Sequence, residues 1–275
     1  MYEYHLTFHQ SCIRDDSGVE NTLIMKFHIF TLFPKMFSEI FSDGIIGRAI
    51  NENLIDIHIH NIRDFSNDKH LSVDDFPYGG GPGMLMKPEP VFNAVNKIKN
   101  DYQIGNTSPI ILTSPQGDKL THNIALNFSE FDEMIIICGR YEGFDERIRQ
   151  NLATHEISLG DFVLSGGEIP AMAIVDSISR LIPNVLGSDE SARNDSFYEN
   201  FLQFPQYTRP ANFQGMKVPK ILLSGNHQDI EKWRKTESIR KTLKRRPDLI
   251  SFNKLNQEEK EIYYQILDEN SKEKE

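Results

Sequence analysis

Charged side chains that could bind a ligand or move a proton gather in residues 138–147, CGRYEGFDER. Arg140 and Glu142 follow EMIIIC, an apolar run typical of a buried strand, and three more charged residues come after them. The start of an exposed helix accounts for the later acidic residues, because carboxylates are favoured near a helix N-terminus. Arg140 and Glu142 fit that explanation less well, so we favour a ligand site at this strand end.

Two other segments have a similar position after an apolar run. TSPQG (residues 113–117) follows PIIL, and SLGDFVLSGGE (residues 158–168) carries a short apolar run of its own. A chain that leaves a strand exposes backbone N–H and C=O groups that are free to bind a ligand. Neither segment, nor the glycine-rich loop PYGGGPG at residues 77–83, contains GxGxxG or GxxxxGKS/T, which argues against the common NAD and ATP sites. Whether the PYGGGPG glycines touch a ligand or only allow a turn stays open.

Other candidate residues have ordinary structural explanations. Asp195, in ARNDSF, is of a type common in turns and caps, and Arg180 lies near the expected end of a helix, where it would complement the helix dipole. Cys138 fits a packed thiol, and the histidines show no metal-ligand spacing. The sequence therefore predicts no metal site.

The elements that must position these segments alternate between strand-like and helix-like patterns. Short apolar runs rich in β-branched residues are bounded by turns and separated by segments with helical periodicity. Strands separated by helices indicate βαβ units and a mainly parallel sheet, and such α/β sheets bind ligands at the carboxyl ends of their strands. The expected strands are residues 26–32, 54–61, 109–113 and 133–138, and the expected helices are residues 35–51, 88–100 and 121–128.

The organisation changes after residue 186. GSDESARNDS is polar and short of apolar anchors, which is typical of a linker, and the remainder is helix-like, with a capping-box pattern at Asn256 and Glu259. The N-terminal residues show no clear periodicity and no basic segment before an apolar core, so they do not resemble a secretory signal. The expected parts are a poorly ordered extension (1–24), an α/β domain (25–186), a flexible linker (187–196) and a smaller all-α domain (197–275).

The net charge of −10 argues against a global electrostatic attraction to nucleic acid. Residues 231–246 are an exception, with eight basic and two acidic residues and a net charge of +6. This stretch is either a solvated helix face or a contact for a polyanion. No apolar run approaches the ~18 residues of a membrane span. The two distant cysteines form no disulfide or metal-ligand pattern, and a reducing, cytoplasmic location is the simplest expectation.

Several motifs together resemble one family. PYGGGPGMLM, LTSPQG, CGRYEGFDER, SLGDFVLSGGEIP, DSFYE, YTRP and LLSGNH occur here in the order of the bacterial tRNA (guanine-N1)-methyltransferase family, TrmD. The resemblance begins near Met25 and extends into the basic stretch. It implies an α/β fold of the SPOUT class with a deep trefoil knot and S-adenosyl-L-methionine as methyl donor. It also implies a homodimer in which the linker of one chain completes the donor site of the other.

The resemblance places the methyl donor among the three segments already singled out. In enterobacterial members of the family a tyrosine stands where this chain has Phe162, which keeps the ring and lacks the hydroxyl. The implied donor-binding residues are Thr113, Ser114, Pro115 and Gly117 on the first segment, Gly139, Arg140 and Tyr141 on the second, and Leu159, Gly160, Asp161, Phe162, Val163, Leu164, Gly166 and Gly167 on the third.

The implied substrate is guanine 37 of a tRNA, next to the anticodon and preceded by guanine 36. N1 of guanine carries a proton, so methyl transfer gains from a general base and from a cation near O6, where negative charge develops. The resemblance assigns Asp195 as the base, Arg180 as its partner at the guanine, and Glu142 as a supporting residue. Because a carboxylate in water is a weak base, we expect the linker to be disordered when free and to fold over the bound guanine.

Two further points follow from the resemblance. The resemblance also implies Mg²⁺ as a cofactor, with Glu142 as the residue that would act with it. The sequence itself shows no cluster of metal ligands. The alternative to a methyltransferase is a non-catalytic RNA-binding protein that retains the fold. Binding of tRNA through the basic stretch without binding of the methyl donor would distinguish that alternative.

Overall fold

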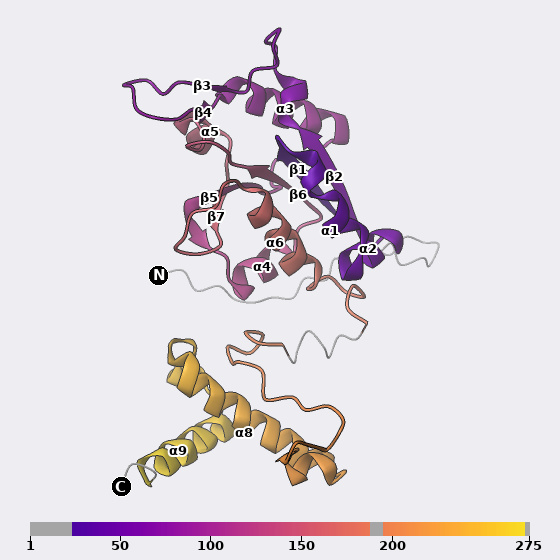
Figure 1. Cartoon of the computed structure of the whole chain (residues 1–275), viewed down its shortest axis with the longest axis vertical. Helices are drawn as coiled ribbons and strands as arrows, with labels where there is room; N and C mark the ends of the chain where they lie inside the picture. Colours follow the sequence, from indigo (N-terminus) through magenta and orange to yellow (C-terminus); the bar gives the residue numbers. More distant parts are fainter. Residues whose placement is uncertain (1–23, 188–194, 273–275) are drawn as a thin grey trace. The chain divides into compact units, whose positions relative to one another are not determined.

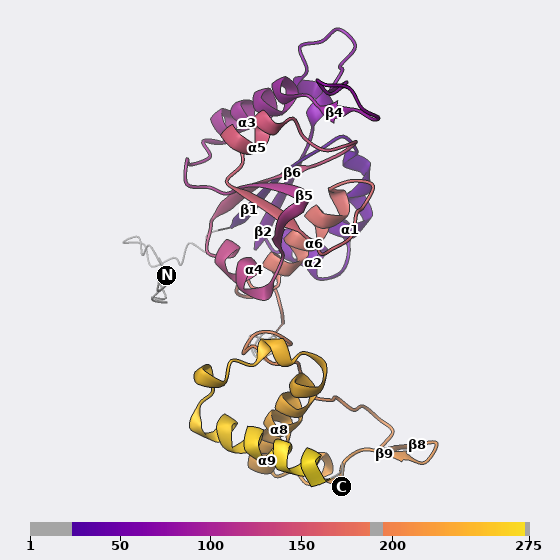
Figure 2. The same ribbon diagram turned by 90° about the vertical axis from the view of Figure 1, so that its left-hand side faces the viewer.

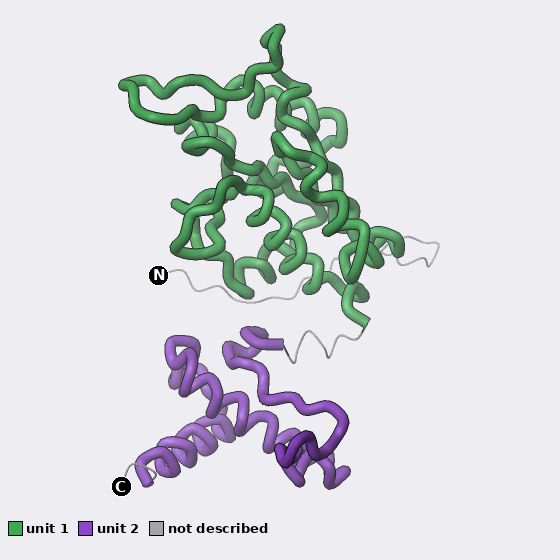
Figure 3. Tube along the Cα trace, viewed as in Figure 1, with its two compact units in different colours: residues 1–187 green, residues 188–275 purple. Residues whose placement is uncertain are grey.

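The computed structural model describes residues 24–187 and 195–272, which form two compact units divided after Gly187 (Figure 3). The predicted extension therefore lies outside the described residues except for Ile24, and so does most of the predicted linker. In the part of the chain that the structure describes, no helix has the length and apolar character needed to cross a membrane.

A parallel five-stranded sheet forms the centre of the first unit (Figure 1). Its strands are β1 (Met25–Thr31), β2 (Ile55–Asn61), β5 (Ile110–Lys119), β6 (Glu133–Cys138) and β7 (His155–Ser158). They lie in the order β2-β1-β6-β5-β7, and every neighbouring pair is parallel. The central strands β1 and β6 are buried along almost their whole length, as expected for strands covered on both faces. The predicted α/β fold with a parallel sheet is confirmed.

Helices cover both faces of this sheet (Figure 2). They are α1 (Ser38–Ser42), α2 (Gly44–Asn51), α3 (Pro88–Tyr102), α4 (His122–Phe128), α5 (Glu146–Asn151) and α6 (Glu168–Ser179). Alternate residues of a strand point to opposite faces. Ile29 and Ile136 accordingly pack with α1, α2, α4 and α6, whereas Phe30 and Ile137 pack with α3 and α5. Short elements complete the unit: η1 (Pro34–Met36), η2 (Ile62–Phe65), β3 (Asp74–Asp75) and β4 (Leu85–Met86).

Two predicted elements differ from the structure. The expected single helix over residues 35–51 is broken into η1, α1 and α2, because Asp43 is extended and Gly44 has φ +66°. The expected strand over residues 109–113 continues as β5 to Lys119, with an irregularity between Thr113 and Asp118 in its pairing with β7. Both differences are local backbone features that an apolar pattern does not encode.

The second unit contains two long helices, α8 (His227–Arg245) and α9 (Gln257–Lys272). Ile239 of α8 and Ile262 and Ile266 of α9 share a small core with Phe201 and Leu255. Its other elements are η3 (Lys220–Leu223), η4 (Pro247–Leu249), η5 (Phe252–Lys254), β8 (Asn212–Phe213) and β9 (Met216–Lys217).

The ends of these elements follow local sequence signals. The capping box at the start of α9 is confirmed, because Asn256 Oδ1 accepts from the Glu259 backbone N–H at 2.9 Å and Glu259 Oε2 accepts from the Asn256 backbone N–H at 2.9 Å. The prediction of an all-α second domain misses the β8–β9 hairpin. This hairpin turns at Gln214 and Gly215, which both have positive φ, as two-residue hairpin turns require.

Candidate active site

A pocket of about 270 Å³ lies at the carboxyl ends of β6 and β7 and beside the irregular part of β5 that follows Thr113. This is the edge at which parallel sheets bind ligands, and the three segments singled out in the sequence meet there. Residues of all three line it, together with apolar side chains from β7 and α6. Its lining residues are Thr113, Ser114, Pro115, Gln116, Gly139, Arg140, Tyr141, Glu142, Gly143, Phe144, Arg149, Ile157, Ser158, Leu159, Phe162, Val163, Leu164, Ser165, Gly166, Gly167 and Pro170.

Buried hydrogen bonds around Thr113 hold the three segments together. The Thr113 hydroxyl donates to the Ile137 carbonyl at 3.2 Å and accepts from the Gly139 N–H at 3.2 Å. The Gly167 N–H in turn donates to the Gly139 carbonyl at 2.8 Å. A Cβ at Gly167 would overlap Thr113 Oγ1, so only glycine lets the third segment approach this closely. Much of the pocket is therefore formed by main-chain atoms.

The glycine-rich loop is attached to the second segment at its base. Glu142 N–H donates to the Met84 carbonyl at 2.9 Å, and Met86 N–H donates to the Gly143 carbonyl at 2.9 Å. A Cβ at Gly83 would overlap the Glu142 side chain, whereas residues 79–81 have positive φ and open space around them. The tip of the loop thus needs glycine for its turns, and Gly83 needs it for close contact with the pocket segment.

Arg140 and Glu168 form a buried ion pair behind the pocket. Glu168, the first residue of α6, is fully buried, and its Oε2 lies 2.8 Å from Arg140 Nη2. Its Oε1 accepts a hydrogen bond of 2.8 Å from the Thr31 hydroxyl at the end of β1. Arg140 also donates to the Ser165 carbonyl, and its guanidinium carbon lies 4.3 Å from the centre of the Phe33 ring. The pair thereby joins β1, the segment after β6, and α6.

Gly166 lies directly against this ion pair. A Cβ there would overlap the guanidinium of Arg140 and would come within 2.6 Å of Glu168 Oε2. Burial also raises the pKa of the neighbouring Cys138 thiol, and the negative charge of Glu168 acts in the same direction. Cys138 is fully buried and neutral, so the predicted packed thiol is confirmed.

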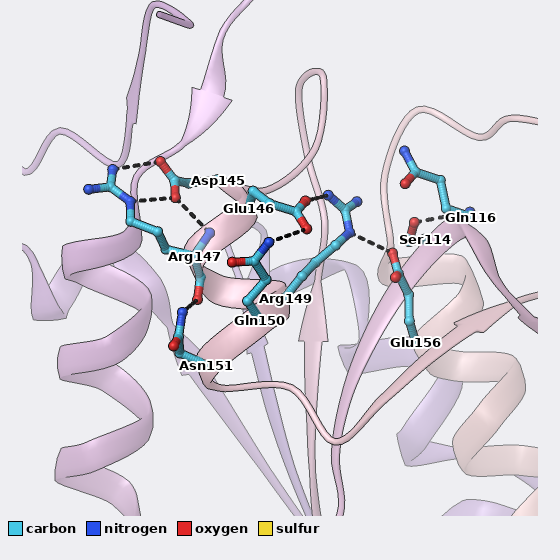
Figure 4. Close-up of polar contacts among 9 residues, drawn as sticks. All are labelled: Ser114, Gln116, Asp145, Glu146, Arg147, Arg149, Gln150, Asn151 and Glu156. Atoms are coloured by element: carbon cyan, nitrogen blue, oxygen red, sulfur yellow. Dashed lines mark hydrogen bonds and ion pairs between the residues drawn. The ribbon is translucent and has the colours of Figure 1, made fainter.

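Helix α5 begins beside the pocket with a set of charged contacts (Figure 4). Asp145 caps it by accepting from the backbone N–H of Arg147, and the side-chain hydrogen bond from Arg147 lowers the Asp145 pKa. Arg149 donates to Glu156 of β7 at 2.9 Å and to Glu146 at 3.3 Å. The predicted helix start is therefore confirmed for Asp145 and Glu146, and Arg149 fixes α5 to the edge of the sheet beside the pocket.

Most of the predicted donor-binding residues line the pocket, and three do not. Gly117 packs against β7, where a Cβ would overlap the Glu156 backbone. Asp161 is exposed, with its Oδ2 2.6 Å from Lys119 Nζ, and Gly160 exchanges hydrogen bonds with the Ser158 hydroxyl. These three shape the surrounding loops, and their role in binding the donor stays a prediction. The predicted residues that line the pocket are Thr113, Ser114, Pro115, Gly139, Arg140, Tyr141, Leu159, Phe162, Val163, Leu164, Gly166 and Gly167, together with Glu142.

Arg180 and Asp195 are not among the lining residues of this pocket. Arg180 directly follows α6 in the first unit and is half-buried. Asp195 belongs to the second unit, where it lines another pocket with Phe204, Arg234 and Lys235 among others. Their roles at the guanine remain predictions.

Sequence reasoning missed part of the pocket and its buried support. Gln116, Gly143, Phe144 and Ser165 lie within the three segments and adjoin predicted residues, so the segments contained them although the residue-level prediction did not. Glu168 could have been identified from the sequence, because this charged residue stands between Gly166-Gly167 and the apolar residues of a helix. Its partners Thr31 and Arg140 are distant in sequence, and no local pattern identifies them. The missed lining residues are Gln116, Gly143, Phe144, Arg149, Ile157, Ser158, Ser165 and Pro170.

Comparisons with known proteins agree on one family. The family described as tRNA (Guanine-1)-methyltransferase TrmD matches residues 25–252. A tRNA (guanine-N(1)-)-methyltransferase of Dehalococcoides mccartyi is 51% identical over 245 residues, covering 89% of this chain and 98% of the relative. The enzymes of the same name from Dictyoglomus turgidum and Clostridioides difficile are 49% and 51% identical, over 90% and 82% of this chain and 98% and 97% of their own lengths. The chain belongs to the TrmD family of tRNA (guanine-N1)-methyltransferases.

Proposed function

We propose that this protein transfers a methyl group from S-adenosyl-L-methionine to N1 of guanine 37 in tRNAs that carry guanine at position 36. The observation that supports this most directly is the pocket of the first unit, which brings together the three segments that the family resemblance assigns to the donor. Several relatives that match most of this chain carry the name of that enzyme. Those names do not favour a non-catalytic RNA-binding protein.

The residues of the pocket suit this donor. Ile157, Leu159, Phe162, Leu164 and Pro170 provide apolar surface for an adenine ring, and the main chain at the ends of β5 and β6 provides polar groups. Glycines whose Cβ atoms would overlap their neighbours leave room for a ligand to approach the backbone. S-adenosyl-L-methionine supplies an electrophilic methyl group when it is bound here.

The protein's own residues must remove a proton from the guanine and stabilise the negative charge that develops there. We assign Asp195 as the base that takes the proton from guanine N1, and Arg180 as the cation that stabilises the charge developing at O6. Glu142 lines the donor pocket and is assigned a supporting role there. Phe162 offers a ring and no hydroxyl at its place in the pocket, so the donor contact at this position is by packing alone.

The finer architecture is part of this proposal. We infer a SPOUT fold with a deep trefoil knot in a donor-binding domain of residues 25–186, a linker over residues 187–196, and a largely helical tRNA-binding domain of residues 197–275, in a cytoplasmic enzyme. A homodimer with a shared active site is supported by the apolar side chains exposed beside the pocket. Phe162 is 54% exposed, Val163 82% and Ile169 51%, and a second copy would cover such a surface.

No site is assigned to Mg²⁺. Within residues 24–187 and 195–272, no group of three or more His, Cys, Asp or Glu side chains is arranged to hold a metal ion. Mg²⁺ stays an expectation from the family resemblance, and no step above is assigned to it.

The test is transfer of labelled methyl from S-adenosyl-L-methionine to tRNA with guanines at positions 36 and 37, followed by mapping of the modified base. Asp195→Asn should bind donor and tRNA and lose transfer by about 100-fold or more, the usual contribution of a general base. Asp248→Asn, which removes a carboxylate paired with Arg246 in the same unit, is the matched control. Near-normal transfer by Asp195→Asn would show that the base assignment is wrong, and absence of donor binding by calorimetry would support the non-catalytic alternative.

A further inference from the structure

The β8–β9 hairpin is the most exposed described part of the second unit. All residues from Gln206 to Lys217 are exposed, and the hairpin extends away from α8 and α9 (Figure 2). Each strand has two residues, with Asn212 opposite Lys217 and Phe213 opposite Met216. An isolated two-stranded hairpin is only marginally stable in water. Because it protrudes, this element is accessible to another molecule.

The hairpin presents an apolar pair to solvent. Phe213 and Met216 are directly opposed across the two strands, so their side chains lie on the same face. They are 55% and 63% exposed, and Tyr207, a few residues before the hairpin, is 51% exposed. The rings of Phe213 and Tyr207 offer flat surfaces on which bases can stack, and Met216 adds apolar surface beside Phe213. Because both faces of the hairpin are exposed, these side chains are accessible from outside the unit.

The stretch of sequence that contains the hairpin carries only positive charge. Residues 200–228 contain no Asp or Glu, although the chain as a whole has 40 acidic residues among 275. The cations in this stretch are Arg209, Lys217 and Lys220, and none of them forms an ion pair with another described residue. An exposed, cationic stretch without acidic residues favours a polyanionic partner.

Helix α8 differs, although it carries more basic residues. Arg234 pairs with Glu231 at 2.6 Å, and Lys235 pairs with Glu199 and Glu259 at 2.8 and 2.7 Å. Similar contacts hold Arg240 to Glu237 and Glu269, and Arg246 to Asp248. Four of the eight cations of residues 231–246 are therefore held by carboxylates, whereas Lys232, Lys241, Lys244 and Arg245 form no ion pair with a described residue. Free positive charge accordingly lies on the stretch around the hairpin as well as on α8.

We propose that the β8–β9 hairpin is a contact site for the RNA substrate. Phe213 and Met216 pack against unpaired bases, and Arg209, Lys217 and Lys220 contact phosphates. This inference rests on the proposed function, since it takes tRNA as the substrate. A second copy of the chain is a less suitable occupant, because stable protein interfaces bury about 800 Å² per partner, and the two strands present only two large apolar side chains.

Two hairpin variants of the full chain test the proposal against one matched control. Phe213→Ala/Met216→Ala removes the stacking surface, and Arg209→Gln/Lys217→Gln/Lys220→Gln removes three free charges. Arg234→Gln/Arg240→Gln/Arg246→Gln removes three charges that are paired on and next to α8. Binding of an unmodified tRNA transcript is measured by filter binding at several salt concentrations. Donor binding is measured by calorimetry, and folding by circular dichroism.

The expected results separate stacking from charge. The apolar variant should weaken tRNA binding about fivefold or more with little change in salt dependence. The hairpin charge variant should flatten the slope of log K against log salt by about 2, which corresponds to three lost contacts with single-stranded RNA. The control should flatten it by less than half as much. Donor binding should be unchanged in all three, since the mutated residues belong to the second unit.

Three results would overturn the inference. Both hairpin variants could bind tRNA within twofold of the wild type, or the α8 control could flatten the slope as much as the hairpin variant. The apolar variant could also dissociate into monomers while its tRNA affinity stays the same, which would assign the hairpin to contact with a second copy. Failure of the proposed function can be distinguished from failure of this inference. In that case the wild type itself would form no methylguanine in the labelled-methyl assay, whatever tRNA affinity the hairpin variants have.

Discussion

Charged residues serve opposite purposes in the two units. In the first unit Arg140 and Glu168 are paired in the interior, with side chains 16% and 0% exposed, and they support a pocket built largely of main-chain atoms. In the second unit several pairs lie on the surface, as in Arg234 and Glu231 with 38% and 66% exposure. A buried pair fixes geometry because neither ion tolerates loss of the other, whereas a surface pair mainly cancels local charge.

The largest effect is expected from removal of the buried carboxylate. Glu168→Ala leaves the Arg140 guanidinium without its partner and should lower the free energy of unfolding of the first unit by about 3 kcal/mol. Glu231→Ala, which breaks a surface pair in α8, should cost no more than about 0.5 kcal/mol. Hydrogen exchange of β5 and β6 amides reports the first unit, and fluorescence of Trp233, the single tryptophan, reports the second. Similar losses of stability in the two variants would show that the buried pair and the surface pair contribute equally.

The next effect concerns close main-chain contact in the pocket. Gly167→Ala places a Cβ against Thr113 Oγ1 and the Gly139 backbone, and should weaken donor binding more than tenfold and lower stability by about 1–3 kcal/mol. Gly105→Ala is the control, because a Cβ there meets its nearest atom, Ser108 Oγ, at an ordinary 3.6 Å. Calorimetry with S-adenosyl-L-methionine measures the affinity. Unchanged donor binding in Gly167→Ala would show that the pocket tolerates a wider separation of its segments.

A buried histidine group makes the first unit sensitive to acid. His28 on β1 stacks on His58 and His60 of β2, with ring centres 4.9 and 5.5 Å apart, and Tyr102 of α3 lies against it. Burial, with smaller contributions from His58, His60 and Lys26, lowers the pKa of His28 to about 3, and burial lowers that of His60 to about 4. Both histidines are therefore neutral in the folded protein at pH values at which the unfolded chain is protonated.

The sign of the pH effect follows from this difference. The contribution to stability is complete above the unfolded pKa of 6.5 and is lost as pH falls towards the folded values of about 3 and 4. We expect the first unit to lose about 1–2 kcal/mol between pH 7 and pH 5. His28→Phe should reduce that loss, whereas His227→Gln, at an exposed position at the start of α8, should not. Hydrogen exchange of β1 amides at both pH values measures it, and a pH dependence that is unchanged in His28→Phe would contradict the assignment.

The smallest effect is expected at the end of α8. Arg246 is paired with Asp248 at 2.7 Å on the surface, so Arg246→Gln should change tRNA affinity by less than about twofold and leave the unfolding midpoint unchanged. Filter binding and urea denaturation followed by Trp233 fluorescence are the measurements. A loss of affinity above threefold would place this residue directly on the RNA and weaken the distinction between paired and free charge.

Strong local patterns predicted the fold and the outline of the site. Continuous apolar runs such as EMIIIC define strands, and the ends of parallel strands must meet at one edge, which is why three distant segments were placed in one pocket. The break at Asp43 and Gly44 was missed because it is a backbone feature inside a helical pattern. The β8–β9 hairpin was missed because its two-residue strands are too short to alternate. The Arg140–Glu168 pair depends on tertiary packing, and a sequence pattern cannot encode it.

The main-chain character of the pocket has a consequence for inhibition of the enzyme. A Cβ at Gly166 or Gly167 would overlap buried neighbours, and one at Gly139 would lie 3.0 Å from the Phe144 ring and the Thr113 carbonyl. A compound that binds against the backbone of these glycines leaves few substitutions by which the protein can evade it. Resistance through a change at these positions would damage the pocket to which we assign the natural donor, and escape would have to arise at the exposed rim, where Phe162 and Val163 lie.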